Sequence, residues 1–93
     1  MNPSSQLPKL RKYVESVDCE IIKLIRERFI FTNQIQNLKR LLELPLQSKK
    51  REAELLKKYR NLAKRYKLPE GLIKKLFKSI FYYSKKSGIM KRT

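Results

Sequence analysis

The stretch LIRERFIFTNQIQNLKR, residues 24–40, carries the pattern that decides the fold. Apolar residues recur in it at helical spacing, and the pattern extends beyond it in both directions. One row is Leu7, Val14, Ile21, Arg28, Ile35 and Leu42, and the interleaved row is Leu10, Val17, Leu24, Phe31 and Leu38. Heptad spacing of this kind forms the seam along which one helix packs on another. It predicts one helix over about residues 7–42, roughly 50 Å long at about 1.5 Å per residue.

Two shorter helices are expected to follow. Pro45 interrupts the periodicity, and Ser48 is a suitable N-cap for the second helix. KLPEG at residues 67–71 marks another break, with Pro69 suited to the first turn of a third helix. Gly88 is expected to end that helix, since glycine is the usual left-handed residue after a helix. The apolar faces are Leu55, Leu56, Tyr59, Leu62, Ala63 and Tyr66 on the second helix, and Leu72, Ile73, Leu76, Phe77, Ile80 and Phe81 on the third.

The long helix reaches well past the two shorter ones. One chain folded on itself would leave part of its seam bare, and pairing with a second copy would cover that surface. No strand, repeat or inter-domain linker is predicted. The expected fold is therefore a single all-α domain over residues 1–93 that associates with a second copy.

Each predicted helix turns one polar residue toward its apolar side: Arg28, Glu52 and Ser84. An ordinary explanation for any one of them is that it lies near a helix end or reaches solvent. Arg28 fits that explanation least, because its seam neighbours in both directions are apolar and a cation there loses water unless an anion replaces it. The three together indicate a buried polar cavity that holds a small polar ligand.

The composition excludes several kinds of chemistry. The chain has no His and one cysteine, Cys19, so Ser-His-Asp and Cys-His catalysis and ordinary zinc sites are ruled out, and no metal or cofactor is expected. No apolar run could span a membrane, and the start MNPSSQLPK lacks the apolar core of a signal peptide, so a cytoplasmic protein is expected. Lys and Arg outnumber Asp and Glu by 24 to 8, for a formal net charge of +16. Such a charge attracts polyanions, anionic membranes or small anionic metabolites, and the charge alone does not select one of these three.

Four stretches carry a resemblance to a known family. They are LRKYVESVDCEIIKLIRERF at residues 10–29, Lys39, SKKRE at residues 48–52 and IKKLFKSIFYYS at residues 73–84. In this order and register the chain resembles the AroQ-class chorismate mutases, which are all-helical intertwined dimers. The resemblance implies an isomerase that rearranges chorismate to prephenate in the shikimate pathway of aromatic amino acid biosynthesis, without a cofactor.

The resemblance also implies roles for the positively charged residues. Arg11 and Arg28 would bind the two carboxylates of chorismate, with Ser84 assisting. Lys39 would contact the ether oxygen of the breaking bond and a carboxylate.

Further roles are implied at the start of the second helix. Glu52 would hold the ring hydroxyl, helped by the backbone near Ser48, and Arg51 would line the same wall. Ser48 departs from the Asp often present in this place, a mild change if the backbone makes the contact.

The spacing of Arg11 and Lys39 requires a second chain if both bind one substrate. They are 28 residues apart, roughly 42 Å along a straight helix. No small metabolite bridges that distance, so Arg11 must come from a copy whose first helix runs antiparallel, with the two-fold axis near residues 21–24. The predicted assembly is an intertwined antiparallel homodimer with two identical shared sites.

Three other functions remain open at this stage. An isochorismate pyruvate lyase would use a similar cationic pocket on a closely related substrate. A basic helical dimer could bind nucleic acid, but the chain contains no known recognition motif and its aromatic residues lie mainly at packing spacing. A homologue with weak catalysis could regulate or bind a partner enzyme.

Gly88 is the main departure from the resemblance. Members of the family usually present a Gln or Glu there as a second donor to the ether oxygen, and loss of one such donor costs about 10² to 10³ in rate. We expect either a slow mutase or one in which Lys91 or another group near the C-terminus replaces the donor. Turnover of Gly88→Gln beside the wild type addresses this: a gain indicates a missing donor, and equal rates indicate that the donor is supplied elsewhere or that the site is not used in this way.

Overall fold

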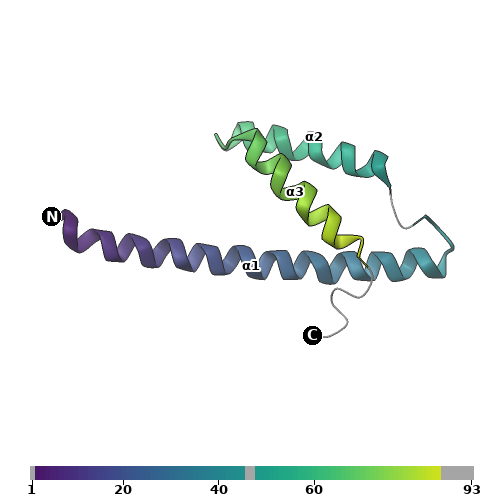
Figure 1. The fold of residues 1–93 in the computed structure, drawn as a ribbon, viewed down its shortest axis with the longest axis horizontal. Helices are drawn as coiled ribbons and strands as arrows, with labels where there is room; N and C mark the ends of the chain where they lie inside the picture. Colours follow the sequence, from purple (N-terminus) through teal and green to yellow (C-terminus); the bar gives the residue numbers. More distant parts are fainter. Residues whose placement is uncertain (1, 46–47, 87–93) are drawn as a thin grey trace.

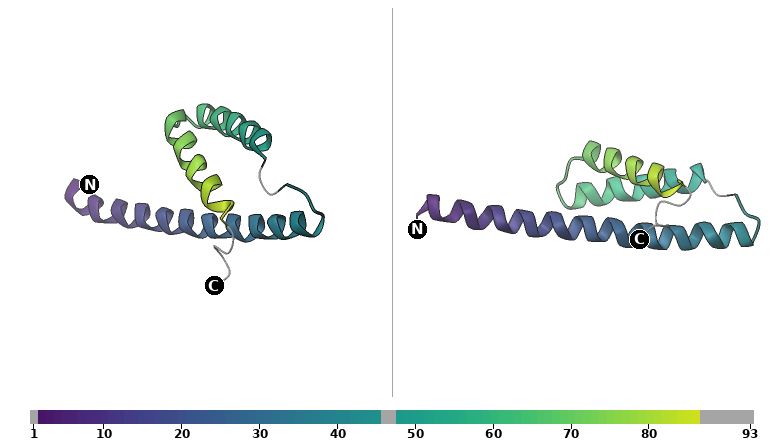
Figure 2. Two further views of the ribbon diagram at one scale, coloured as in Figure 1. Left: turned by 45° about the vertical axis from the view of Figure 1, so that its right-hand side comes forward. Right: turned by 60° about the horizontal axis from the view of Figure 1, so that its bottom comes forward.

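The computed structural model describes residues 2–45 and 48–86, and in these ranges the chain forms three helices and no strand. They are α1 (Pro3–Leu41), α2 (Lys49–Arg65) and α3 (Glu70–Ser84). Figure 1 shows α1 as a single rod, with α2 and α3 folded back as a hairpin over its C-terminal half. The two further views in Figure 2 show the N-terminal half of α1 projecting alone. The all-α class and the order of one long and two shorter helices are confirmed.

The long helix begins earlier than the heptad pattern predicted. α1 starts at Pro3 and includes Pro8, whereas a start near Leu7 was expected. Asn2 explains the difference, because its Oδ1 accepts hydrogen bonds from the backbone N and the Oγ of Ser4, at 3.1 and 2.7 Å. This cap satisfies a free N–H of the first turn, and proline is tolerated close to a helix start.

Two non-glycine residues in left-handed conformation end α1 and α2. Glu43 has φ 55° and Lys67 has φ 59°. In each case the backbone N–H of the next residue donates a hydrogen bond to a carbonyl of the last turn. Leu44 N donates to Lys39 O and Leu68 N donates to Ala63 O, both at 2.8 Å. These bonds satisfy carbonyl groups of the last turn, as glycine would normally allow.

The second and third helices begin within a residue of the predicted positions. Ser48 caps α2 as expected, because its Oγ accepts from the backbone N of Arg51 at 3.2 Å. Pro69 is the N-cap of α3, one residue before the helix, and not part of its first turn as expected. The prediction that Gly88 ends α3 concerns a residue outside the described ranges; α3 itself ends at Ser84.

A small core joins the three helices. Its buried apolar residues are Ala63, Ile80 and Phe81. α3 packs against both α2 and α1. The rings of Tyr59 and Phe77 lie 4.5 Å apart, and those of Phe77 and Phe81 lie 6.1 Å apart. The aromatic contacts therefore hold the hairpin together, and the C-terminal end of α3 attaches it to α1.

The apolar seam of α1 is uncovered in the single chain. No residue of α1 is buried. The apolar seam residues are between 45% exposed, for Ile21, and 66% exposed, for Leu42, whereas Arg28 is half-buried. A contiguous apolar surface of this length is unusual for a monomer. The polar exception in the seam is thus better enclosed than its apolar neighbours.

The cap of α2 leads to a test of stability. Replacing Ser48 by Ala removes the acceptor for the Arg51 amide, so we expect the free energy of unfolding to fall by about 1 kcal/mol. Ser48→Asp keeps an acceptor and should unfold like the wild type. Denaturant unfolding of the three proteins at one fixed concentration measures this, and equal stability of Ser48→Ala would contradict the role of the cap.

Candidate active site

Arg28 and Ser84 join α1 to the end of α3. Arg28 Nη1 donates a hydrogen bond to Ser84 Oγ at 3.0 Å, and Ser84 Oγ donates to the carbonyl oxygen of Ile80 at 2.7 Å. The Arg28 guanidinium also lies over the ring of Phe81, 5.2 Å from its centre. Ser84 is buried, with 6% of its surface exposed. These contacts hold the guanidinium in a defined orientation at the seam.

Glu52 faces α3 from the first turn of α2. Its Oε1 lies 2.5 Å from Lys85 Nζ, in an ion pair between α2 and the end of α3. The side chain of Glu52 is 21% exposed and that of Lys85 is 34% exposed, which makes this the most enclosed of the ion pairs found among the described residues. The negative charge of Glu52 is therefore balanced by a residue one position beyond Ser84.

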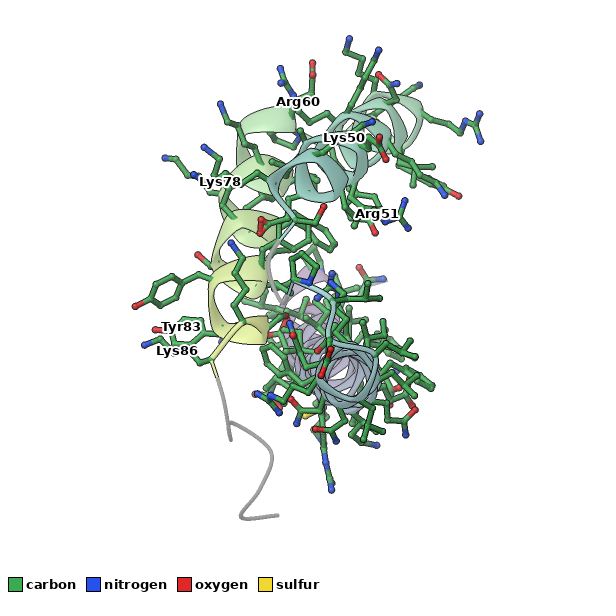
Figure 3. All side chains as sticks on the ribbon, turned by 90° about the vertical axis from the view of Figure 1, so that its right-hand side faces the viewer. Lys50, Arg51, Arg60, Lys78, Tyr83 and Lys86 are labelled. Atoms are coloured by element: carbon green, nitrogen blue, oxygen red, sulfur yellow. The ribbon has the colours of Figure 1, made fainter. Side chains whose placement is uncertain are left out.

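A cavity of about 110 Å³ lies between α1, the start of α2 and the end of α3. Its lining contains six of the residues predicted for the site: Arg28, Lys39, Ser48, Arg51, Glu52 and Ser84. The structure thus brings together residues that are up to 56 positions apart in the chain, as the polar interruptions of the three helices predicted. Figure 3, which looks along α1, shows Arg51 at the α2 side of this region.

Arg11 is not part of this cluster. It is exposed on the projecting half of α1, 17 residues before Arg28, which is roughly 26 Å along the helix. Within one chain it cannot reach the cavity. Gly88, also predicted for the site, lies outside the described residues.

Three polar residues of the lining were not predicted: Thr32, Gln36 and Lys85. Thr32 and Gln36 follow Arg28 at intervals of four on α1, so helical spacing from Arg28 to Lys39 could have indicated them. Lys85 lies just past the last residue of α3, where periodicity gives no direction for a side chain.

The charges around the cavity favour an anion. Four cations and one carboxylate line it: Arg28, Lys39, Arg51, Lys85 and Glu52. Arginine binds a carboxylate with two parallel hydrogen bonds and so fixes its orientation.

Within residues 2–45 and 48–86, no group of three or more His, Cys, Asp or Glu is placed to hold a metal ion. The described helices also include none that is long and apolar enough to cross a membrane.

The comparisons with known proteins agree with this geometry. A family model described as chorismate mutase type II matches residues 10–88, which include all the predicted site residues. A chorismate mutase of Methanocaldococcus jannaschii is 28% identical over 80 residues, covering 86% of this chain and 81% of that protein. The chain belongs to the chorismate mutase type II family.

Proposed function

We propose that this protein is a chorismate mutase that rearranges chorismate to prephenate in the cavity between α1, α2 and α3. The observation that carries the proposal is the convergence of two cations from α1, Arg28 and Lys39, and one carboxylate from α2, Glu52, around a single cavity. Chorismate is a dicarboxylate with a ring hydroxyl and an ether oxygen. The cavity offers cations for the carboxylates, a hydrogen-bond acceptor for the ring hydroxyl and a hydrogen-bond donor for the ether oxygen.

The reaction needs no group that this chain lacks. The ether carbon–oxygen bond of chorismate breaks while a carbon–carbon bond forms between the enolpyruvyl group and the ring, and every atom of the substrate remains in the product. No nucleophile, proton acceptor or metal takes part. The protein must hold a compact conformer in which the two carbons are close, and stabilise negative charge that develops on the ether oxygen.

Arg28 serves the first of these needs. Its guanidinium is oriented by Ser84 and by the ring of Phe81 before any substrate is present. A carboxylate that binds to this fork is therefore fixed in direction as well as in place. Such preorganisation reduces the ordering that the substrate must undergo on binding.

Lys39 and Glu52 contact the ether oxygen of the breaking bond and the ring hydroxyl next to it. Lys39 is half-buried on α1 and lines the cavity, where its ammonium group donates to the ether oxygen. Glu52 accepts the hydrogen bond of the ring hydroxyl from the opposite wall, beside the backbone of Ser48, and Arg51 adds positive charge there.

The second carboxylate calls for a residue from a second copy of the chain. In the proposed homodimer the first helices run antiparallel, and Arg11 of each copy enters the cavity of the other between Arg28 and Lys39. The bare seam of α1 supports this arrangement, because an antiparallel copy centred near residues 21–24 would cover it along its whole length. Assembly and completion of the site are then one event.

The activity is tested by replacing Arg28. We expect the wild type to consume chorismate in an absorbance assay. The rate of Arg28→Ala should be lower by a factor of about 10² to 10³ or more, because the variant lacks a donor to negative charge on the substrate. Arg26→Ala is the matched control, since Arg26 is exposed on the outer side of the same helix and does not line the cavity.

Two results would contradict the assignment. Equal rates for the wild type and Arg28→Ala would remove Arg28 from the mechanism. Isochorismate consumed faster than chorismate, with release of pyruvate, would indicate a lyase in the same fold.

The sharing of sites is tested by mixing two inactive variants. When Arg11→Ala and Arg28→Ala chains are refolded together in equal amounts, half of the dimers are mixed, and each mixed dimer has one site with both arginines. About a quarter of the wild-type activity should return if the sites combine residues from both copies.

The control for this mixture pairs Arg28→Ala with Lys39→Ala. Both changes then lie in the part of the site contributed by one chain, so every site in a mixed dimer is damaged and activity should stay low. Recovery in the control, or none in the first mixture, would argue against Arg11 acting across the dimer.

A further inference from the structure

Lys85 holds a defined place at the wall of the cavity. It is the C-cap of α3, and its backbone N donates to Phe81 O at 3.3 Å. The preceding residue, Ser84, is buried and bonded to Arg28. The backbone that carries Lys85 is therefore anchored beside the hydrogen bond between Arg28 and Ser84, and its side chain lines the cavity.

The ammonium group of Lys85 has more hydrogen-bond donors than its contact with Glu52 uses. It offers three donors and no acceptor. One of these donors faces Glu52, whose Oε1 lies 2.5 Å from Lys85 Nζ in a close ion pair. At least one N–H can therefore donate to another oxygen in the cavity while the ammonium group stays next to the Glu52 carboxylate.

A purely structural role explains this pair less well. The hairpin of α2 and α3 is already joined by aromatic contacts from Tyr59 through Phe77 to Phe81. Partly exposed ion pairs add little to stability. The pair instead sets a cation on the α3 wall, facing a cavity that Lys39 enters from α1.

We propose that Lys85 is a further catalytic residue, which donates one hydrogen to Glu52 and another to the ether oxygen of chorismate. The inference rests on the proposed function. In chorismate the ring hydroxyl and the ether oxygen are on adjacent ring carbons. A cation 2.5 Å from the carboxylate that holds the hydroxyl would therefore lie against the part of the substrate that carries the ether oxygen.

This role accounts for the departure at position 88. The chain has glycine at position 88, which has no side chain that could donate to the ether oxygen. Lys85 and Lys39 together give that oxygen two donors from different helices. A lysine suits the task, since its charge is compact, whereas the planar fork of arginine suits the carboxylates.

The experiment compares Lys85→Met with Lys86→Met. Lys86 has the same charge one position along, but its Nζ lies 4.5 Å from the centre of the Tyr82 ring, and Figure 3 shows it on the side of α3 away from α1 and α2. Lys86 is a cation at neutral pH like any exposed lysine, and the hydrogen bond with Tyr82 raises its pKa further. The control therefore removes an equal charge from outside the cavity.

We expect Lys85→Met to lower kcat by about 10² to 10³, with a much smaller change in KM, because the donor acts on charge that develops in the transition state. Lys86→Met should keep the wild-type kcat. Lys85→Arg, which retains the charge beside Glu52, should recover part of the loss. Melting curves of each variant, recorded with the assay well below the melting temperature, separate this effect from unfolding.

The outcomes distinguish this inference from the proposed function. A wild type that does not consume chorismate would refute both. An active wild type with an unchanged kcat in Lys85→Met, or with a raised KM alone, would refute the role of Lys85 and leave the mutase assignment standing. If Lys85→Met does not fold, Lys85→Ala gives the same comparison with a shorter side chain that has no hydrogen-bond donor, and an unchanged kcat in it would also refute the inference.

Discussion

The hydrogen bond from Arg28 to Ser84 is the contact on which both the fold and the site depend. α1 has no buried residue, so the attachment of the hairpin to it rests on the end of α3, where Arg28 lies over Phe81 and bonds to Ser84. The same guanidinium faces the cavity. A partly buried donor that loses its acceptor costs stability. The charge that would bind the substrate is thus also the charge that holds the monomer together.

The helices could be predicted from the sequence because their signals are local. Apolar spacing located all three, and Ser48 marked the start of α2 through its cap. The polar interruptions at Arg28 and Glu52 pointed to a common cavity, since residues on seams that face one another must meet. The ends of α1 and α2 fall close to the breaks predicted at Pro45 and at residues 67–71. The left-handed conformation of Glu43 and Lys67 could not be predicted, because without glycine it is imposed by the surrounding structure and has no signal of its own.

The part of the candidate site that could not be predicted lies where helical periodicity stops. Lys85 follows the last residue of α3, and the direction of its side chain depends on how the final turn is closed. Many other lysines in this chain resemble it in sequence context, so composition does not single it out. Arg11 presents a different difficulty: its distance from Arg28 shows that one chain cannot place it, and only a second copy could.

In the proposed homodimer, an apolar seam with a cation in its centre would make assembly and activity two aspects of one equilibrium. Apolar residues from 45% to 66% exposed in the single chain would supply the driving force for pairing. Cations brought together by that pairing would oppose it, because like charges repel most in a space that excludes water. A bound dicarboxylate would relieve the repulsion and so stabilise the dimer by binding it in preference to the separated chains. In a chain with a net charge of +16, this requirement gives a physical reason for one carboxylate, Glu52, to remain among the cations of the cavity: it moderates the repulsion while the site is empty.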